Sequence, residues 1–469
     1  MILTILTVLE VVLLFNLLIG VHELGHFLAA KWRGLQIDRF AIWFGKPIWS
    51  KTIGGVEYAL GWIPAGGYVA LPQMATMEAL EGKTQNSGKP LPEISPLDKI
   101  IVAFAGPLFS FLLAFGFAVL VWVVGRPVNQ EDHTTTIGWV DPAVGAGRAG
   151  LRPGDTVLAI DGHPVTHFLA PPMDDSINWH IITSEGSKVA VTYVRDGKTN
   201  TLYATPYLKP TKWYERRAVR QLMIAPEVET VIDTVMTNGP AATAGLKSGD
   251  KIIAINGTNI YSPNAVFAAE LEQTNGIHPV TFTVSRNHSQ LDCIIHPERP
   301  LKPKNADPSF GIADFVVNTN IALDHPSPAD QIAESAGQIF ATIGALTHHN
   351  DVGIEQLGGP VVISRVYISL LSSEEGWRKV LWFSVVLNVN LALLNLLPFP
   401  VLDGGHITLA LMEAIRRRPV SARLVQYVYT ACAIALIGFL LLIGFYDASD
   451  WVRSDSGGRG TPIEFSPKH

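Results

Sequence analysis

Long apolar stretches alternate with polar ones along this chain of 469 residues. Four stretches are long enough to cross a bilayer as helices, since about 20 apolar residues span its hydrocarbon core. They cover residues 2–30, 100–124, 380–397 and 424–445. The pattern predicts an α-helical polytopic membrane protein with four transmembrane helices and a long segment of mixed pattern between the second and third.

Composition agrees with a membrane protein. Hydrophobic residues make up 48% of the chain and charged residues only 16%, which is too apolar for an ordinary soluble enzyme. The net charge of −6 is small and argues against a nucleic-acid partner. The two cysteines, Cys293 and Cys432, are too few for a disulfide framework. The first stretch lacks a basic leader and a clear cleavage site, so we expect it to be retained.

Basic residues follow the first apolar stretch and separate the third from the fourth. They are Lys31, Arg33, Arg39, Lys46 and Lys51 in one connection, and Arg416, Arg417, Arg418 and Arg423 in the other. The positive-inside rule places both connections in the cytoplasm. Alternation of four helices then places both termini and the long middle segment on the other side of the membrane.

The first apolar stretch ends in the sequence HELGH, residues 22–26. Residues i and i+4 share one face of a helix, so His22 and His26 can bind one metal ion. Glu23 then lies beside the metal, where it can take a proton from bound water. These residue types at this spacing predict a zinc site with Glu23 as the catalytic base. Glu10, in the same stretch, is assigned no role.

The third apolar stretch ends in NLLPFPVLDGG, residues 395–405. Pro398 and Pro400 cannot continue a regular helix, and irregular backbone at membrane depth is tolerated only where protein or water surrounds it. We therefore expect a broken helix that lines a pocket. A hydrolytic zinc site uses three protein ligands and one open position. Asp403 is our choice for the third ligand because topology puts it at the depth of the histidines, and His406 is its rival.

Two further features near this pocket have alternative interpretations. Asn390 and Asn395 either hydrogen-bond neighbouring helices or bind the backbone of an unwound substrate, and we favour the second. The sequence GGVEYALGWIPAGGYVAL, residues 54–71, predicts a β-hairpin lying against the membrane. This hairpin either covers the helices or offers an edge strand to an extended substrate. Residues 82–97 are predicted to form a flexible loop.

The middle segment contains a repeat. The sequence AGLRPGD at residues 149–155 recurs as AGLKSGD at residues 244–250, and a β-rich stretch follows each copy. A repeat of this length predicts two copies of one module. The pattern AGLxxGDxIxxING resembles bacterial PDZ domains, which implies two tandem α+β PDZ domains between helices two and three. Such domains bind extended peptides by strand addition, and they can also act as a steric gate that excludes bulky proteins.

The predicted organisation has nine parts. Residues 1–30 form the first helix, 31–98 the cytoplasmic hairpin and loop, and 99–124 the second helix. The first PDZ domain covers 125–215, the second covers 222–298, and a linker with a membrane-surface helix covers 299–378. Residues 379–411 form the third, broken segment, 424–446 the fourth helix, and 447–469 a disordered tail.

Taken together, HELGH in the first helix, NLLPFPVLDGG in the third and PDZ-like repeats between the second and third resemble the site-2 protease family, in its bacterial regulator-of-sigma-E type. The resemblance covers the chain to about residue 446. It implies that His22, His26 and Asp403 bind zinc, that Glu23 is catalytic, and that Asn390 and Asn395 hold substrate. In one departure, Ser110 of AGPLFS stands where the family often has asparagine.

These inferences predict a zinc-dependent intramembrane protease of the bacterial cytoplasmic membrane, with its active site near the cytoplasmic face. Its expected substrates are single-pass transmembrane segments, such as a pre-trimmed anti-sigma factor in an envelope stress response, or remnant signal peptides. One alternative is a non-proteolytic PDZ scaffold for envelope quality control, which needs no zinc. Another is a metal transporter, although the ligands of a transporter would be strung along a pathway.

Overall fold

The structure is a computed structural model that describes residues 2–74, 94–129, 133–169, 175–212, 214–303, 306–316, 322–348, 352–417, 422–458 and 463–466. The chain divides into two compact units. The first, here called the helical unit, comprises Met1–Pro127, Leu323–Ile339 and Leu357–Asp447. The second, the sheet unit, comprises Val128–Ala322, Phe340–Gln356 and Ala448–His469.

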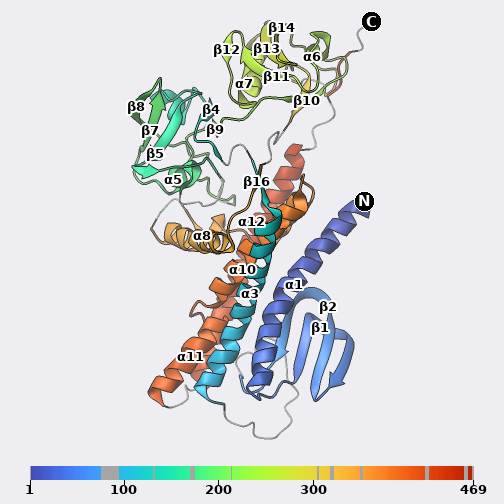
Figure 1. Cartoon of the computed structure of the whole chain (residues 1–469), viewed down its shortest axis with the longest axis vertical. Helices are drawn as coiled ribbons and strands as arrows, with labels where there is room; N and C mark the ends of the chain where they lie inside the picture. Colours follow the sequence, from blue (N-terminus) through green and yellow to red (C-terminus); the bar gives the residue numbers. More distant parts are fainter. Residues whose placement is uncertain are drawn as a thin grey trace. The chain divides into compact units, whose positions relative to one another are not determined.

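Four helices of the described residues are long and apolar enough to cross a membrane, as the sequence predicts. They are α1 (Ile2–Trp32), α3 (Pro96–Val124), α10 (Gly376–Asn395) and α12 (Ala422–Gly458), labelled in Figure 1. Helix α12 continues past residue 446, so residues 447–458 are helical where the sequence analysis expected a disordered tail.

Small residues let α3 pack closely against its neighbours in the helical unit. A Cβ atom at Gly25 of α1 would lie 2.3 Å from the carbonyl oxygen of Ala105 in α3, a distance that no side chain tolerates. Close backbone approach at glycine is a usual way for membrane helices to associate. On another part of α3, Ala114, Ala118 and Val121 form a buried cluster with Val385 and Val389 of α10. Helix α3 thus lies between α1 and α10 (Figure 1).

The hairpin in the helical unit is larger than the sequence analysis predicted. Strand β1 (Arg39–Ile53) pairs antiparallel with β2 (Val56–Ala70) through a turn at Gly54 and Gly55. Both turn glycines have positive φ, 60° and 84°, which favours glycine there. The stretch predicted to hold both strands therefore supplies the turn and β2 alone. Residues 82–93 of the predicted loop lie outside the described residues, and its last two residues, Pro96 and Leu97, belong to α3.

The third apolar segment breaks before Asp403. Helix α10 ends at Asn395, and α11 (Asp403–Arg416) begins after an irregular stretch. A Cβ at Gly404 would lie 2.2 Å from the Leu396 carbonyl oxygen, and one at Gly405 would lie 2.2 Å from that of Phe399. The glycine pair therefore lets the chain fold back tightly. Ahead of α10, α9 (Pro360–Leu371) is a second helix, after α8, in the region 299–378 where one helix was predicted.

The two repeat copies have the same sheet topology, and each buries its own apolar core. The first sheet has the order β6-β5-β7-β8, and the second has the order β12-β11-β13-β14. The first set comprises β5 (Thr156–Ile160), β6 (His163–Pro164), β7 (Val189–Arg195) and β8 (Lys198–Ala204). The second comprises β11 (Lys251–Ile255), β12 (Thr258–Asn259), β13 (Val280–Arg286) and β14 (Ser289–Ile295).

Each copy also has a helix before its third strand and a separate strand pair. The helices are α5 (Ile177–Thr183) and α7 (Asn264–Glu272). The strand pairs are β4 (Ile137–Val140) with β9 (Ile224–Pro226), and β10 (Ile232–Val235) with β15 (Ile312–Phe315). Because β9 and β15 follow residues 215 and 298, each copy extends beyond its predicted end.

The remaining elements are short, apart from α8. They are β3 (Arg126–Val128), α4 (Gly145–Ala149), α6 (Pro240–Thr243), η3 (Gln273–Asn275), β16 (Ala322–Asp324), α8 (Pro328–His348) and η4 (Ile354–Gln356). Helix α8 lies in the region where the sequence analysis expected a membrane-surface helix.

Candidate metal centre

Three predicted ligands come together in the helical unit. His22 and His26 lie one turn apart on α1, and Asp403 is the first residue of α11. The two Nε2 atoms are 3.2 Å apart. Asp403 Oδ2 lies 3.2 Å from His22 Nε2, and Asp403 Oδ1 lies 3.4 Å from His26 Nε2. All three residues are buried, with exposed fractions of 7%, 1% and 7% for His22, His26 and Asp403.

These distances fit a tetrahedral zinc ion. With zinc–nitrogen bonds of about 2.0–2.1 Å, two ligand atoms at a tetrahedral angle lie about 3.3 Å apart. The ligand atoms of His22, His26 and Asp403 all lie within 4.8 Å of one another. Among the described residues, this is the one such group of three or more.

Hydrogen bonds hold both imidazoles with Nε2 toward Asp403. His22 Nδ1 lies 2.9 Å from the Ser110 hydroxyl, and His26 Nδ1 donates to the Val102 carbonyl oxygen at 2.8 Å. A proton on Nδ1 leaves the Nε2 lone pair free for a metal. Both partners lie on α3. The sequence analysis missed Val102, since a backbone acceptor has no sequence signal, and it noted Ser110 only as a departure from a family pattern.

The space between the imidazoles is kept open by a glycine. A Cβ atom at Gly106 would lie 2.2 Å from His26 Nε2 and 2.8 Å from His22 Nε2. Asp403 Oδ2 is buried and has no hydrogen-bond partner among the described residues. A buried carboxylate oxygen without a donor is costly, and a divalent cation would compensate it. The donor set and this space therefore fit a bound metal.

Glu23 lies beside this group, next to the hairpin. Its Oε2 atom is buried without a hydrogen-bond partner among the described residues. Its carboxylate also interacts with the backbone of Val69 in β2. A Cβ at Gly67 of the same strand would come within 3.4 Å of Glu23 Cγ. One carboxylate oxygen is thus anchored near β2, while the other is available to a reacting group.

The asparagines lie on α10, the helix that leads to Asp403. Asn390 is partly buried, and its Oδ1 has no hydrogen-bond partner among the described residues. Asn395 is the last residue of α10. Asn388, which the sequence analysis overlooked, is fully buried and donates to the Ser384 carbonyl oxygen at 2.8 Å. Its signal was present, since it is a third asparagine in the same apolar stretch.

His406, the rival ligand, lies one turn beyond Asp403 on α11. Its ring nitrogens are 3.3 and 3.4 Å from the Tyr429 hydroxyl of α12. His406 is not part of the group with three ligand atoms close together.

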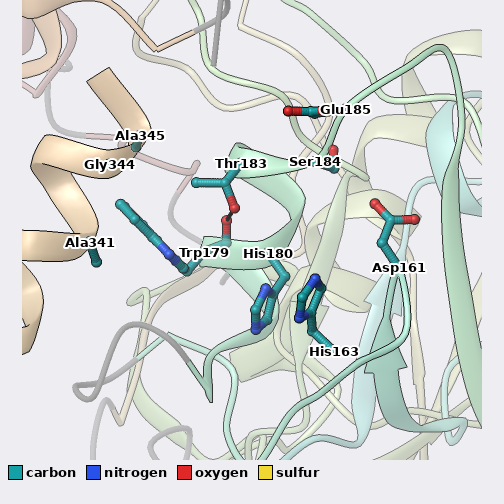
Figure 2. A pocket seen from close by; sticks show the side chains of 10 residues that line it. All are labelled: Asp161, His163, Trp179, His180, Thr183, Ser184, Glu185, Ala341, Gly344 and Ala345. Carbon is teal, nitrogen blue, oxygen red and sulfur yellow. Dashed lines mark hydrogen bonds between the residues drawn. The ribbon is translucent and has the colours of Figure 1, made fainter. Parts of the chain in front are cut away.

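The sheet unit contains a separate histidine pair in a cavity of about 590 Å³. His163 and His180 stack in parallel with ring centres 4.9 Å apart, and Trp179 lies toward Ala341 of α8 (Figure 2). Asp161 and Glu185 also line the cavity. Within the described parts of the chain, these side chains do not form a group of three close metal ligands.

The geometry defines a candidate metallohydrolase centre, and similarity to known proteins gives its class. The chain matches the model of peptidase family M50 over residues 10–439, and it therefore belongs to this family. Membership confirms the resemblance to site-2 proteases and makes the chain a peptidase.

Relatives align with nearly the full length of the chain. It is 28% identical over 449 residues to the "Regulator of sigma E protease" of Haemophilus influenzae, covering 92% of this chain and 96% of that protein. It is 28% identical over 462 residues to a "Putative zinc metalloprotease" of Vibrio cholerae, covering 93% and 97%. It is 28% identical over 453 residues to "Protease RseP" of Yersinia pestis, covering 92% and 96%.

Proposed function

We propose that this metalloprotease cleaves single-pass transmembrane segments, with His22, His26 and Asp403 as zinc ligands and Glu23 as the catalytic base. Zinc is its cofactor, in keeping with its family and with the relative named a zinc metalloprotease. One observation carries the proposal. Three buried ligand atoms from α1 and α11 lie within 4.8 Å of one another, and α1 is apolar enough to cross a membrane.

Each residue has a chemical role in peptide hydrolysis. Zinc, when bound, polarises a peptide carbonyl and lowers the pKa of water toward neutrality. Glu23 accepts the proton of the attacking water and returns it to the leaving amine. The anchored position of its carboxylate beside β2 supports this role, since one oxygen remains without a hydrogen bond. The Val102 carbonyl oxygen holds His26 in the tautomer that binds metal, and the Ser110 hydroxyl can accept from His22 Nδ1 in the same way.

A transmembrane substrate must unwind before it can be cut, because a helix encloses its carbonyl groups in internal hydrogen bonds. The last part of β2, Gly67–Ala70, pairs with β1 along one edge and lies beside Glu23, which suits it to accept an extended segment by strand addition. The side-chain amides of Asn390 and Asn395 offer donors and acceptors for the freed backbone groups. Asn390 suits this role because its Oδ1 is buried without a partner among the described residues.

The repeat copies are proposed to be PDZ domains, and their common strand order supports this. We place both domains and both termini outside the cytoplasm of a bacterial cell, with the metal centre near the cytoplasmic face, on the positive-inside rule. The domains bind peptides or exclude bulky proteins. Substrates are pre-trimmed single-pass proteins, such as an anti-sigma factor, and remnant signal peptides. The names of the Haemophilus and Yersinia relatives support sigma-E regulation.

The test is to co-express a tagged single-pass substrate with the Glu23→Gln variant. Loss of the base should slow cleavage by about 10²–10⁴-fold, while the purified variant keeps its zinc. Glu10→Gln is the matched control, because Glu10 is an exposed residue of the same helix and should be dispensable. Unchanged cleavage by Glu23→Gln would remove Glu23 from the mechanism.

A further inference from the structure

The C-terminal tail returns to the sheet unit after α12 and pairs with the chain that follows β14. Glu464 forms an antiparallel bridge with Lys302. The Leu301 amide donates to the Glu464 carbonyl oxygen at 2.7 Å, and the Glu464 amide donates to the Lys302 carbonyl oxygen at 3.1 Å. Residues 463–466 are therefore held as an extended segment along residues 298–302, here called the strip, which follow β14 in the second copy.

Side chains add one weak contact and one strong one. Lys302 Nζ lies 2.9 Å from Glu464 Oε2, but these side chains are 67% and 55% exposed. An ion pair this exposed contributes little to stability. Phe465, by contrast, is only 6% exposed, although Ile463, Glu464 and Ser466 around it are all exposed. Burial of its ring makes Phe465 the anchor of the segment.

The strip is connected to the core of the second copy. Glu298 bridges Ser309, whose amide donates back to the Glu298 carbonyl oxygen at 2.9 Å. The next residue, Phe310, is 1% exposed and belongs to the buried cluster of this copy. Strand β15 begins two residues later. A segment docked on 298–302 thus braces the chain that leads into the edge strand β15.

The end of α12, from which the tail starts, is held by two ion pairs. Near the end of α12, Asp450 pairs with Arg216 at 2.6 Å and Arg453 pairs with Glu215 at 3.5 Å. Only residues 459–462 separate the end of α12 from the docked segment. A short connection gives the segment a high effective concentration, so a contact too weak to form between separate molecules can persist within one chain.

We propose that residues 463–466 are an intramolecular ligand of the second copy, and that the strip 298–302 is a site for an extended segment that buries one aromatic ring. Docking attaches the chain that follows α12 to the second copy. The site is distinct from the metal centre, and the contact is reversible because it depends on one buried ring and a few backbone hydrogen bonds.

The first test measures docking in trans. A fluorescein-labelled peptide of residues 459–469 is titrated into detergent-purified full chain and into a chain that ends at Gly458. Fluorescence anisotropy should detect binding to the shortened chain and at least tenfold weaker binding to the intact one, whose own tail competes. The peptide with Phe465→Ala should bind the shortened chain at least tenfold more weakly. Equal binding to both chains, or no effect of Phe465→Ala, would overturn the proposal.

The second test uses the intact chain. A Lys302→Cys/Glu464→Cys pair should form an intramolecular disulfide under mild oxidation, because bridged residues have the Cα separation that a disulfide needs. Mass spectrometry of the digested protein identifies the link. The control pair is His288→Cys/Glu464→Cys. His288 is exposed at the far end of β14, about 20 Å from the strip at 3.3 Å per residue. Equal cross-linking of both pairs, or none at position 302, contradicts docking.

Discussion

Buried aspartates occur in both units of this chain, but they are satisfied in different ways. In the sheet unit, Asp155 and Asp250 are each 1% exposed and receive two hydrogen bonds of 2.6 Å from Arg195 and Arg286 respectively. Each also accepts a backbone amide, from Arg152 at 2.7 Å and from Lys247 at 2.8 Å. Among the described residues, Asp403 in the helical unit has neither arginine nor amide donors, only two imidazole nitrogens at 3.2 and 3.4 Å.

The difference separates a structural carboxylate from a reactive one. A bidentate arginine and a backbone amide give both carboxylate oxygens of Asp155 and of Asp250 a donor, so neither oxygen is left without a partner. Asp403 retains an acceptor oxygen without a partner among the described residues, and the Nε2 atoms of the two imidazoles face this carboxylate. Burial alone does not mark a site. What marks it is burial without compensation by the chain's own donors.

The largest effect is expected from Asp403→Asn, which removes the carboxylate without a donor. An amide in place of a carboxylate weakens the ligand set, so the purified variant should lose nearly all its zinc and more than about 10²-fold of its activity. Metal content measured by mass spectrometry checks the first result. The matched exchange Asp250→Asn should leave zinc unchanged. Full zinc occupancy in Asp403→Asn would place the third ligand elsewhere.

The next largest effect is expected in the sheet unit. Asp250→Ala removes the partner of Arg286, and breaking a buried pair costs about 3–5 kcal/mol. Because the Arg286 side chain is 26% exposed and can regain water, we expect the lower end of that range, about 3 kcal/mol. Hydrogen exchange of the full-length protein should show faster exchange in β11 and β13. The strands of the first copy, which keep the Asp155–Arg195 pair, provide an internal control.

A smaller effect is expected from Ser110→Ala. Losing the hydroxyl partner of His22 should weaken zinc binding by about 10–100-fold, as is usual for groups that orient a metal ligand. Competition with a coloured chelator measures the affinity directly. Ser110→Asn supplies a polar group again and should recover part of the loss. An unchanged affinity in Ser110→Ala would show that the 2.9 Å contact does not orient His22.

The smallest effect is a loss of stability of the second copy at low pH. Burial raises the pKa of Asp250, but hydrogen bonds from Arg286 and the Lys247 amide outweigh it and hold this pKa below its usual range. A lowered pKa in the folded state means that ionised Asp250 adds stability above the unfolded value of about 3.9. This stability is lost as pH falls below about 4 and passes through the folded value. Hydrogen exchange of β11 should accelerate over that range in the wild type and less in Asp250→Asn.

The sequence predicted the members of the candidate site because their chemistry is unusual for their surroundings. Histidines at i and i+4 and an aspartate after a proline-broken helix stand out in apolar stretches. The repeat was visible because the AGL and GD positions set tight turns in both copies. The four apolar helices followed from length and hydropathy alone.

Other features depend on contacts that have no local signal. Val102 acts through its carbonyl oxygen, and Gly106 matters only because the imidazoles of another helix approach it. Strand β1 was missed because residues 39–53 lack a regular polar–apolar alternation, and β2 supplies its pairing. Helix α9 is stabilised at its start by Asp447 of α12, whose Oδ2 accepts the Gly359 amide at 3.2 Å. Such a partner 88 residues away cannot be inferred from the sequence around α9.

Position 106 has only a hydrogen atom as its side chain, and this leaves room for the two imidazoles. A methyl group there would intrude on both imidazoles without altering a single charge, ligand or hydrogen-bonding group. A Gly106→Ala substitution on α3 is therefore expected to disable the candidate metal centre. An alanine at that point would leave the hairpin and the two repeat copies as they are, but it would push the two imidazoles away from their places beside Asp403.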